Sequence, residues 1–150
     1  MRSYNKLTVA LLGAATLLLA GCASVPMASP DLDAAAKRFE APTDKAAIYV
    51  FRDETMGAAI TMSVFLDEKL VGKTGAKTYY RIEGAPGSHT LRGDAENDSV
   101  LQLDARAGQT YFVWQEVKMG VMIARNKLQI VDASRGQAGV RKCKLALGAE

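Results

Sequence analysis

The sequence predicts an all-β fold, a small antiparallel β-sandwich that occupies residues 45–150. From residue 46 onward, apolar side chains recur with a period of two instead of the 3.6 of a helix. Short apolar runs follow one another at intervals of about eight to twelve residues, and Gly, Pro, Asn and Asp separate them. A domain of this length can build its own core without disulfides.

Each strand is expected where an apolar run lies between turn residues. Residues 46–51 are apolar on both faces, which is typical of a central strand covered on two sides. Residues 62–66 and 70–72 flank the turn Asp67-Glu68 and should form a hairpin. The remaining strands are expected at residues 78–82, 89–92, 100–104, 110–117, 127–131 and 140–147.

The segment 22–44, which precedes these strands, is expected to be a tether with one short helix. Ser29 is a suitable N-cap, and Leu32, Ala36 and Phe39 form a narrow apolar stripe at helical spacing. A helix of two turns is not stable alone in water. Leu32 and Phe39 should therefore dock on the domain behind it.

Residues 1–21 have the pattern of a cleaved lipoprotein signal peptide. A basic head precedes an apolar run, residues 7–19, that is too short to span a bilayer comfortably. Small residues follow, so cleavage is expected between Gly21 and Cys22, and the Cys22 thiol is the expected lipidation site. The alternative is an ordinary secretory signal with a chance cysteine behind it.

A lipid on Cys22 implies attachment to a membrane without a transmembrane helix. Each buried methylene of an acyl chain contributes about 0.8 kcal/mol, so several chains together hold a protein almost permanently. Ala23 and Ser24 follow the cysteine, and neither is the Asp that retains many such lipoproteins in the inner membrane. The expected location is the outer membrane, with the domain facing the periplasm and no cofactor besides the covalent lipid.

The charge of the chain argues against a nucleic-acid partner. The full sequence has a formal net charge of +3, but without Arg2 and Lys6 its 19 basic residues become 17, against 16 acidic residues. A nearly neutral domain offers no electrostatic footprint for nucleic acid.

Several motifs occur in the order found in one lipoprotein family. They are residues 47–52 (AIYVFR), 64–67 (VFLD), 86–91 (PGSHTL), 108–113 (GQTYFV) and 115–120 (QEVKMG). Over about residues 39–147 the chain resembles the family called domain of unknown function 2846. Its hairpin followed by Pro-Gly-x-His is also similar to small immunoglobulin-like sandwich modules of the PEGA type. The resemblance implies a β-sandwich that decorates or connects surface proteins, and it implies no catalytic residue.

His89 is the only histidine and therefore the first candidate for chemistry. Beside Asp94, Glu96 and Asp98 it could serve a small hydrolytic enzyme as general base, or help to bind a metal or ligand. No Ser or Cys nucleophile motif flanks it, and the acidic stretch lacks the spacing of a calcium loop. We expect a structural His89, a solvated loop at residues 94–98, and neither catalytic residues nor a metal site.

Cys143 is the second candidate. Its neighbours Lys142 and Lys144 would activate an exposed thiol by lowering its pKa. In a strand, however, Cys143 shares a face with Leu145 and Leu147, while both lysines point the other way. This pattern favours a buried and inert thiol.

Residues 118–124 are apolar and rich in Met, although they join two strong strands. Met suits adaptable binding surfaces, so Met119, Gly120 and Met122 form a candidate contact patch. The pattern nevertheless favours a further β-strand with both faces partly covered, and the exposed contact patch is the alternative. Residues an odd number apart lie on opposite faces of a strand, so one of the two methionines would be packed and the other exposed.

Together these patterns predict a periplasmic lipoprotein that is anchored in the outer membrane and works by contact. It would be a non-enzymatic binding or structural module of the cell envelope. Its expected partners are the membrane, through the lipid anchor, and an envelope protein. The alternative is the small hydrolase, or a ligand or metal carrier, that uses His89 and the loop carboxylates.

Overall fold

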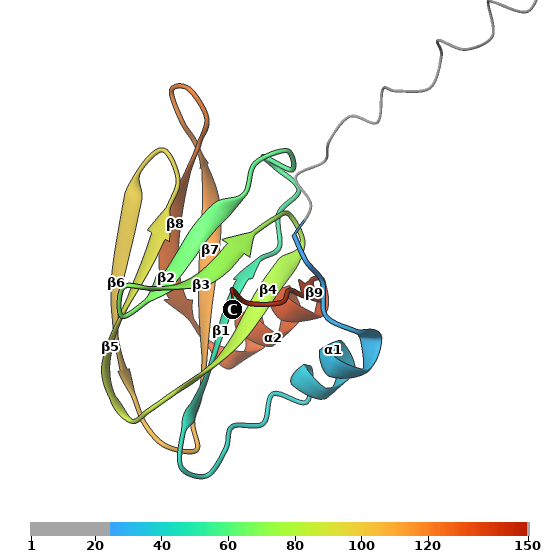
Figure 1. The fold of residues 1–150 in the computed structure, drawn as a ribbon, viewed down its shortest axis with the longest axis vertical. Coiled ribbons are helices and arrows are strands. Elements are labelled where there is room, and N and C mark those ends of the chain that lie inside the picture. Colours follow the sequence, from blue (N-terminus) through green and yellow to red (C-terminus); the bar gives the residue numbers. More distant parts are fainter. Residues whose placement is uncertain (1–24, 150) are drawn as a thin grey trace, which may run out of the picture.

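The computed structural model describes residues 25–149 (Figure 1). The predicted signal peptide, its cleavage site at Gly21 and Cys22, and the lipidation site lie outside these residues. Most of the described chain is β-structure, as predicted. The elements are α1 (Pro30–Ala36), β1 (Ala46–Arg52), β2 (Met62–Leu66), β3 (Lys69–Thr74), β4 (Thr78–Gly84), β5 (Gly87–Asp94), β6 (Asp98–Ala105), β7 (Thr110–Met119), β8 (Ala124–Val131), α2 (Ala133–Arg141) and β9 (Lys144–Leu145).

The strands form a five-stranded sheet in the order β8-β7-β1-β4-β9 and a four-stranded sheet in the order β3-β2-β5-β6. The smaller sheet is antiparallel, as predicted. In the larger sheet β1 runs antiparallel to β4 but parallel to β7, and β9 runs parallel to β4. The expectation of a purely antiparallel fold is therefore wrong for this sheet. The long connection from β1 through β6 allows β7 to return beside β1 in the same direction.

The central strand β1 is buried along its whole length, which confirms the prediction from its apolar sequence. Ile48 and Val50 face the smaller sheet and share a core with its Val64 and Leu91. The alternate residues of β1 face the opposite way, toward the two helices. The larger sheet is thus covered on one face by the smaller sheet and on the other by helices, because β1 presents apolar side chains to both.

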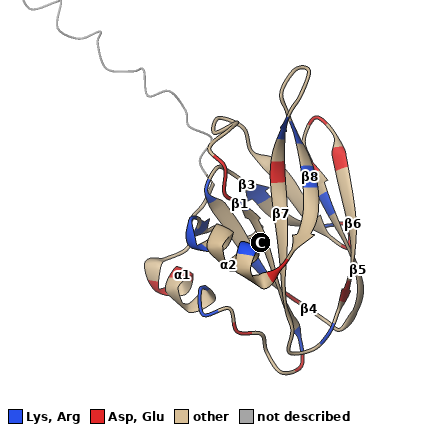
Figure 2. Ribbon diagram, turned by 180° about the vertical axis from the view of Figure 1, so that it is seen from behind, with Lys and Arg blue, Asp and Glu red and all other residues tan. Residues whose placement is uncertain are grey.

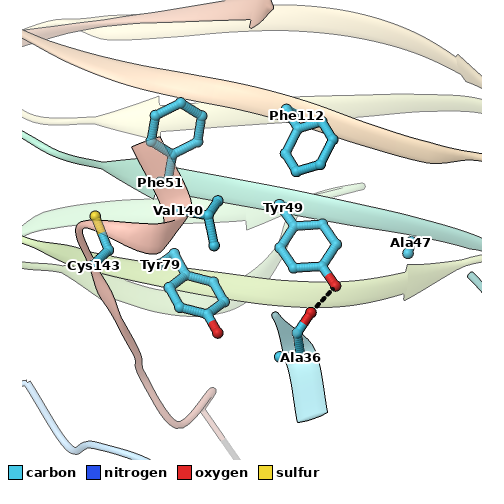
Figure 3. Packing of buried hydrophobic residues seen from close by; sticks show 8 residues of the cluster. All are labelled: Ala36, Ala47, Tyr49, Phe51, Tyr79, Phe112, Val140 and Cys143. Atoms are coloured by element: carbon cyan, nitrogen blue, oxygen red, sulfur yellow. Dashed lines mark hydrogen bonds between the residues drawn. The ribbon is translucent and has the colours of Figure 1, made fainter. Parts of the chain in front are cut away.

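Aromatic side chains fill the core on the helical side of the larger sheet (Figure 3). Helix α1 starts at the predicted cap, where the Ser29 hydroxyl accepts from the backbone of Leu32. The Tyr49 hydroxyl donates to the Ala36 carbonyl at 2.6 Å and holds the other end of this helix. Phe39 docks on Tyr49 at 5.5 Å between ring centroids, as expected, although it lies beyond the helix. Leu32 is 55% exposed, so its predicted docking is wrong.

Helix α2 corrects the prediction of a strand over residues 140–147. The Asp132 side chain caps this helix by accepting from the backbone of Arg135 at 2.9 Å. At Gly136 a Cβ atom would collide with Phe112, and at Gly139 it would collide with Phe51. The two glycines let the helix lie directly on the aromatic rings, and packing outweighs their low helix propensity. The strand that follows is limited to Lys144–Leu145.

The first described residues are attached to the C-terminal segment. Met27 forms a β-bridge with Ala146. The Ala28 amide donates to the Leu145 carbonyl at 2.9 Å, and the Leu147 amide donates to the Pro26 carbonyl at 2.8 Å. Within residues 25–149, neither helix is long and apolar enough to cross a membrane.

Candidate functional site

The hairpin formed by β7 and β8 projects beyond both sheets, at the top of the molecule in Figure 1. Its last residue pair is Met119 and Ala124. Residues 119–123, which we call the hairpin tip, have no charged side chain. Met119 is 82% exposed, Val121 and Met122 are each 88% exposed, and Ile123 is 51% exposed. Such a group of exposed apolar side chains is unusual on a soluble surface and is typical of a contact site.

The exposed tip shows that the favoured prediction of a partly covered strand over residues 118–124 is wrong, and so is the expectation that one of the two methionines is packed. Strand pairing stops at Met119, so alternation no longer orients Met122. Val117 precedes Met119 on the same face and is buried, whereas Met119 lies beyond the core and has nothing to pack on. The contact role of Met119, Gly120 and Met122 itself stays a prediction.

The backbone of the hairpin tip is held by a single carboxylate from the neighbouring β5–β6 loop. Glu96 accepts the backbone N–H groups of Val121 at 2.8 Å, Met122 at 2.7 Å and Ile123 at 2.8 Å. These bonds stabilise the charged form and lower the pKa of Glu96 below its usual value. At Gly120 a Cβ atom would collide with the Ile123 carbonyl, so this turn requires glycine. The tip is therefore an ordered loop in which the backbone N–H groups of residues 121–123 are hydrogen-bonded.

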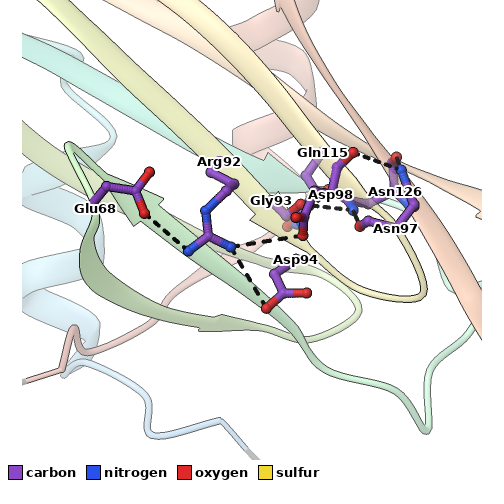
Figure 4. A network of polar contacts seen from close by, with 8 residues as sticks. All are labelled: Glu68, Arg92, Gly93, Asp94, Asn97, Asp98, Gln115 and Asn126. Atoms are coloured by element: carbon purple, nitrogen blue, oxygen red, sulfur yellow. Dashed lines mark hydrogen bonds and ion pairs between the residues drawn. The ribbon is translucent and has the colours of Figure 1, made fainter.

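The root of the hairpin is packed on the rest of the domain. Val117 and Ala124 are buried against Met62 from β2. A polar network adjoins this cluster (Figure 4), in which the Gln115 side chain donates to Asn126 Oδ1 at 3.3 Å. Asn126 in turn donates to the Gly93 carbonyl at 3.2 Å. A buried, hydrogen-bonded root keeps the exposed tip in a fixed position.

Two cations lie directly below the hairpin tip. Lys118 and Arg125 are opposite each other in the strand register, and both are exposed. In Figure 2, basic positions coloured blue lie where β7 and β8 meet an uncharged loop. Lys118 pairs with Glu116 at 2.6 Å.

His89 is held by two acceptors at the start of β5. Its Nδ1 lies 2.6 Å from Asp67 Oδ2, and its Nε2 lies 2.6 Å from the Ala85 carbonyl oxygen. A carboxylate and a carbonyl accept hydrogen bonds, so this geometry favours the imidazolium form, in which both ring nitrogens donate. The Ala85 carbonyl and Asp67 raise the pKa of His89. In this state the ring has no free nitrogen to act as a base.

The structure does not bring His89 together with the acidic loop. Asp94 lies opposite Asp98 in the register of β5 and β6, at the far end of β5. Each of the two carboxylates lies 3.8 Å from the guanidinium of Arg92 (Figure 4). Glu96 is bound to the hairpin tip instead. In the described part of the chain, no group of three or more His, Cys, Asp or Glu side chains is arranged to hold a metal ion.

A comparison with protein families identifies the domain. The family described as "Protein of unknown function (DUF2846)" matches residues 42–127, from before β1 into β8. The chain belongs to the DUF2846 family. This confirms the resemblance to that family, whereas the similarity to PEGA modules stays a prediction. The matched region includes His89, Glu96 and the hairpin tip.

One relative of this DUF2846 protein extends the comparison beyond the matched segment. An uncharacterized protein of Haemophilus influenzae is 29% identical over 133 residues, which is 87% of this chain and 79% of the other. No solved structure matches the chain.

The predicted burial of Cys143 in the DUF2846 domain is confirmed, but the reason given for it is wrong. Cys143 follows helix α2 instead of lying in a strand, and its thiol donates to the Arg52 carbonyl at 3.4 Å. Burial raises the pKa of Cys143 to about 12. The thiol is therefore protonated and unreactive at neutral pH.

Arg52, at the end of β1, has a structural role that the sequence did not predict. Its side chain is fully buried and donates to the carbonyls of Ile60 at 2.7 Å, Met56 at 3.0 Å and Gly57 at 2.6 Å. The guanidinium thereby holds the loop 53–61, which lies against the root of the hairpin at Val117. The only signal in the sequence was a charged residue that continues a buried apolar run.

Proposed function

We propose that this DUF2846 protein is a lipoprotein that is acylated on Cys22 and anchored in the outer membrane. It faces the periplasm and acts by contact, without catalysis. The sequence of residues 1–22 supports the anchor. The two stacked sheets agree with a sandwich of the immunoglobulin or PEGA type, which usually connects or decorates surface proteins.

The observation that carries the contact function is the hairpin tip. Its apolar side chains are exposed, yet its backbone is fixed by Glu96 and its root is buried. A fixed apolar surface loses little conformational entropy when it binds, which favours a contact function. The neutral charge of the mature chain leaves this tip as the feature best suited to recognition.

Metabolic labelling with palmitate tests the anchor. Label should enter the wild-type protein, and Cys22→Ser should abolish both the label and stable association with membranes. Cys143→Ser is the matched control, because it removes the other cysteine and should leave labelling intact. Label that survives Cys22→Ser would reject the lipoprotein proposal.

A further inference from the structure

The hairpin tip and the N-terminal end of the described chain lie toward the same end of the molecule (Figure 1). Val25 lines a pocket together with Thr61, which immediately precedes β2. Met62, the next residue, packs on Val117 and Ala124 at the root of the hairpin. The described chain therefore begins in the half of the molecule from which the tip projects.

The reach of the chain limits how far a lipid anchor can be from this end. Two residues lie between Cys22 and Val25, so the three steps from one Cα atom to the next span at most about 11 Å. Beyond the buried pair Val117 and Asn126 the hairpin extends by two residue pairs and a short turn, a distance of roughly 10 Å. The anchor and the tip can thus reach the same plane.

The chemistry of the tip suits the boundary between lipid headgroups and acyl chains. Val121, Met122 and Ile123 are apolar, and Glu96 satisfies their backbone N–H groups, which would otherwise be costly to remove from water. Lys118 and Arg125 form the next residue pair below the tip, at the height where the lipid phosphates would lie if the tip entered the bilayer. Cations beside an apolar insertion are typical of peripheral membrane contacts.

We propose that the hairpin tip enters the headgroup region of the bilayer that holds the anchor, an inference that rests on the lipid anchor of the proposed function. A lipid surface fits this tip better than a protein does. Specific protein interfaces use about 20–30 residues on each side, whereas the tip offers four exposed apolar side chains. The domain would then contact the membrane at two points, the acylated Cys22 and the tip.

Fluorescence of the lipidated protein in vesicles tests this contact. An environment-sensitive probe is attached to the new thiol of Met122→Cys. The native cysteines should not react with it, because Cys22 is acylated and the Cys143 thiol is buried. Ala107→Cys is the matched control, because it is exposed and lies at the other end of β7. The vesicles contain phosphatidylethanolamine and phosphatidylglycerol. An unchanged unfolding midpoint verifies that each variant folds.

The expected result is that the Met122 probe shifts to the blue, is quenched by a spin label on the acyl chains and is shielded from iodide. The Ala107 probe should show no blue shift, should not be quenched by the spin label and should stay open to iodide. If the protein floats with the vesicles while both probes stay open to iodide, the anchor stands and the tip contact is rejected. Shielding without quenching by lipid would indicate a second copy, and shielding seen only in native envelopes would indicate a protein partner; both would overturn the inference. Failure to float would reject the anchor and the inference together.

Discussion

Replacing the methionines of the hairpin tip should leave the stability of the domain almost unchanged. Met122 is 88% exposed, so its burial supplies only about an eighth of the 1.5–3 kcal/mol of a fully buried side chain, about 0.2–0.4 kcal/mol. Met119 is 82% exposed, and the same reasoning gives about 0.3–0.5 kcal/mol. Met119→Ser and Met122→Ser should each lower the free energy of unfolding by no more than these amounts.

The same substitution at the root of the hairpin provides the contrast. Met62 is fully buried beside Val117 and Ala124. Met62→Ser leaves a cavity and buries a hydroxyl, so it should cost about 2–5 kcal/mol or more. That is a large share of the total stability of a small domain.

Urea unfolding measures all three variants on one scale. The midpoint should move clearly for Met62→Ser and hardly at all for the two tip variants, with an unchanged slope throughout. A loss of 2 kcal/mol or more in Met122→Ser would show that the tip is packed in solution. It would remove the basis for a contact function of this loop.

Three further predictions concern side chains that hold the fold around the tip. Glu96→Gln should loosen the amides of Val121, Met122 and Ile123, as measured by their NMR shifts, because a Gln side chain keeps only one acceptor oxygen. The pKa of Glu96 is lowered, so the wild-type bonds should persist at neutral pH and be lost only as the pH falls through that lowered pKa; unchanged shifts down to pH 2 would contradict this. His89→Gln should preserve any complementation phenotype and cost about 1 kcal/mol in thermal unfolding. The pKa of His89 is raised, so its contribution is complete below about pH 6.5 and is lost as the pH rises through the higher folded value; loss of function at unchanged stability would revive an enzyme. Arg52→Met should cost about 3 kcal/mol or more in urea unfolding, because it leaves three carbonyls without their donor, and a small loss would refute the role of Arg52 in holding the loop.

Local patterns in the sequence predicted most of the β-structure. The apolar run of β1 indicated a strand covered on two faces, and the turn Asp67-Glu68 indicated the β2–β3 hairpin. Both residues of that turn have positive φ, as a tight hairpin requires. The parallel pairing of β1 with β7 could not be predicted, because it depends on long-range packing that no local pattern encodes.

Helix α2 and the hairpin tip show why the remaining features were missed. Gly136 and Gly139 disfavour a helix locally, and only the aromatic surface beneath them explains the helix. Composition identified the Met-rich segment, but its exposure depends on where the core ends. The bond from Glu96 to Met122 joins residues 26 apart in sequence, and nothing in the spacing indicates it.

The attachment of residues 26–28 to the C-terminal segment has a mechanical consequence. A pull on the N-terminal end would load the bonds from Ala28 to Leu145 and from Leu147 to Pro26 before it reached α1. If these bonds opened and α1 unfolded, the 23 residues between Cys22 and Ala46 could extend over roughly 80 Å. The C-terminal segment therefore restrains the folded N-terminal segment, which could extend only after these hydrogen bonds break. If Cys22 carries the proposed lipid anchor, the strength of these hydrogen bonds would set how far the domain can move from the membrane under tension.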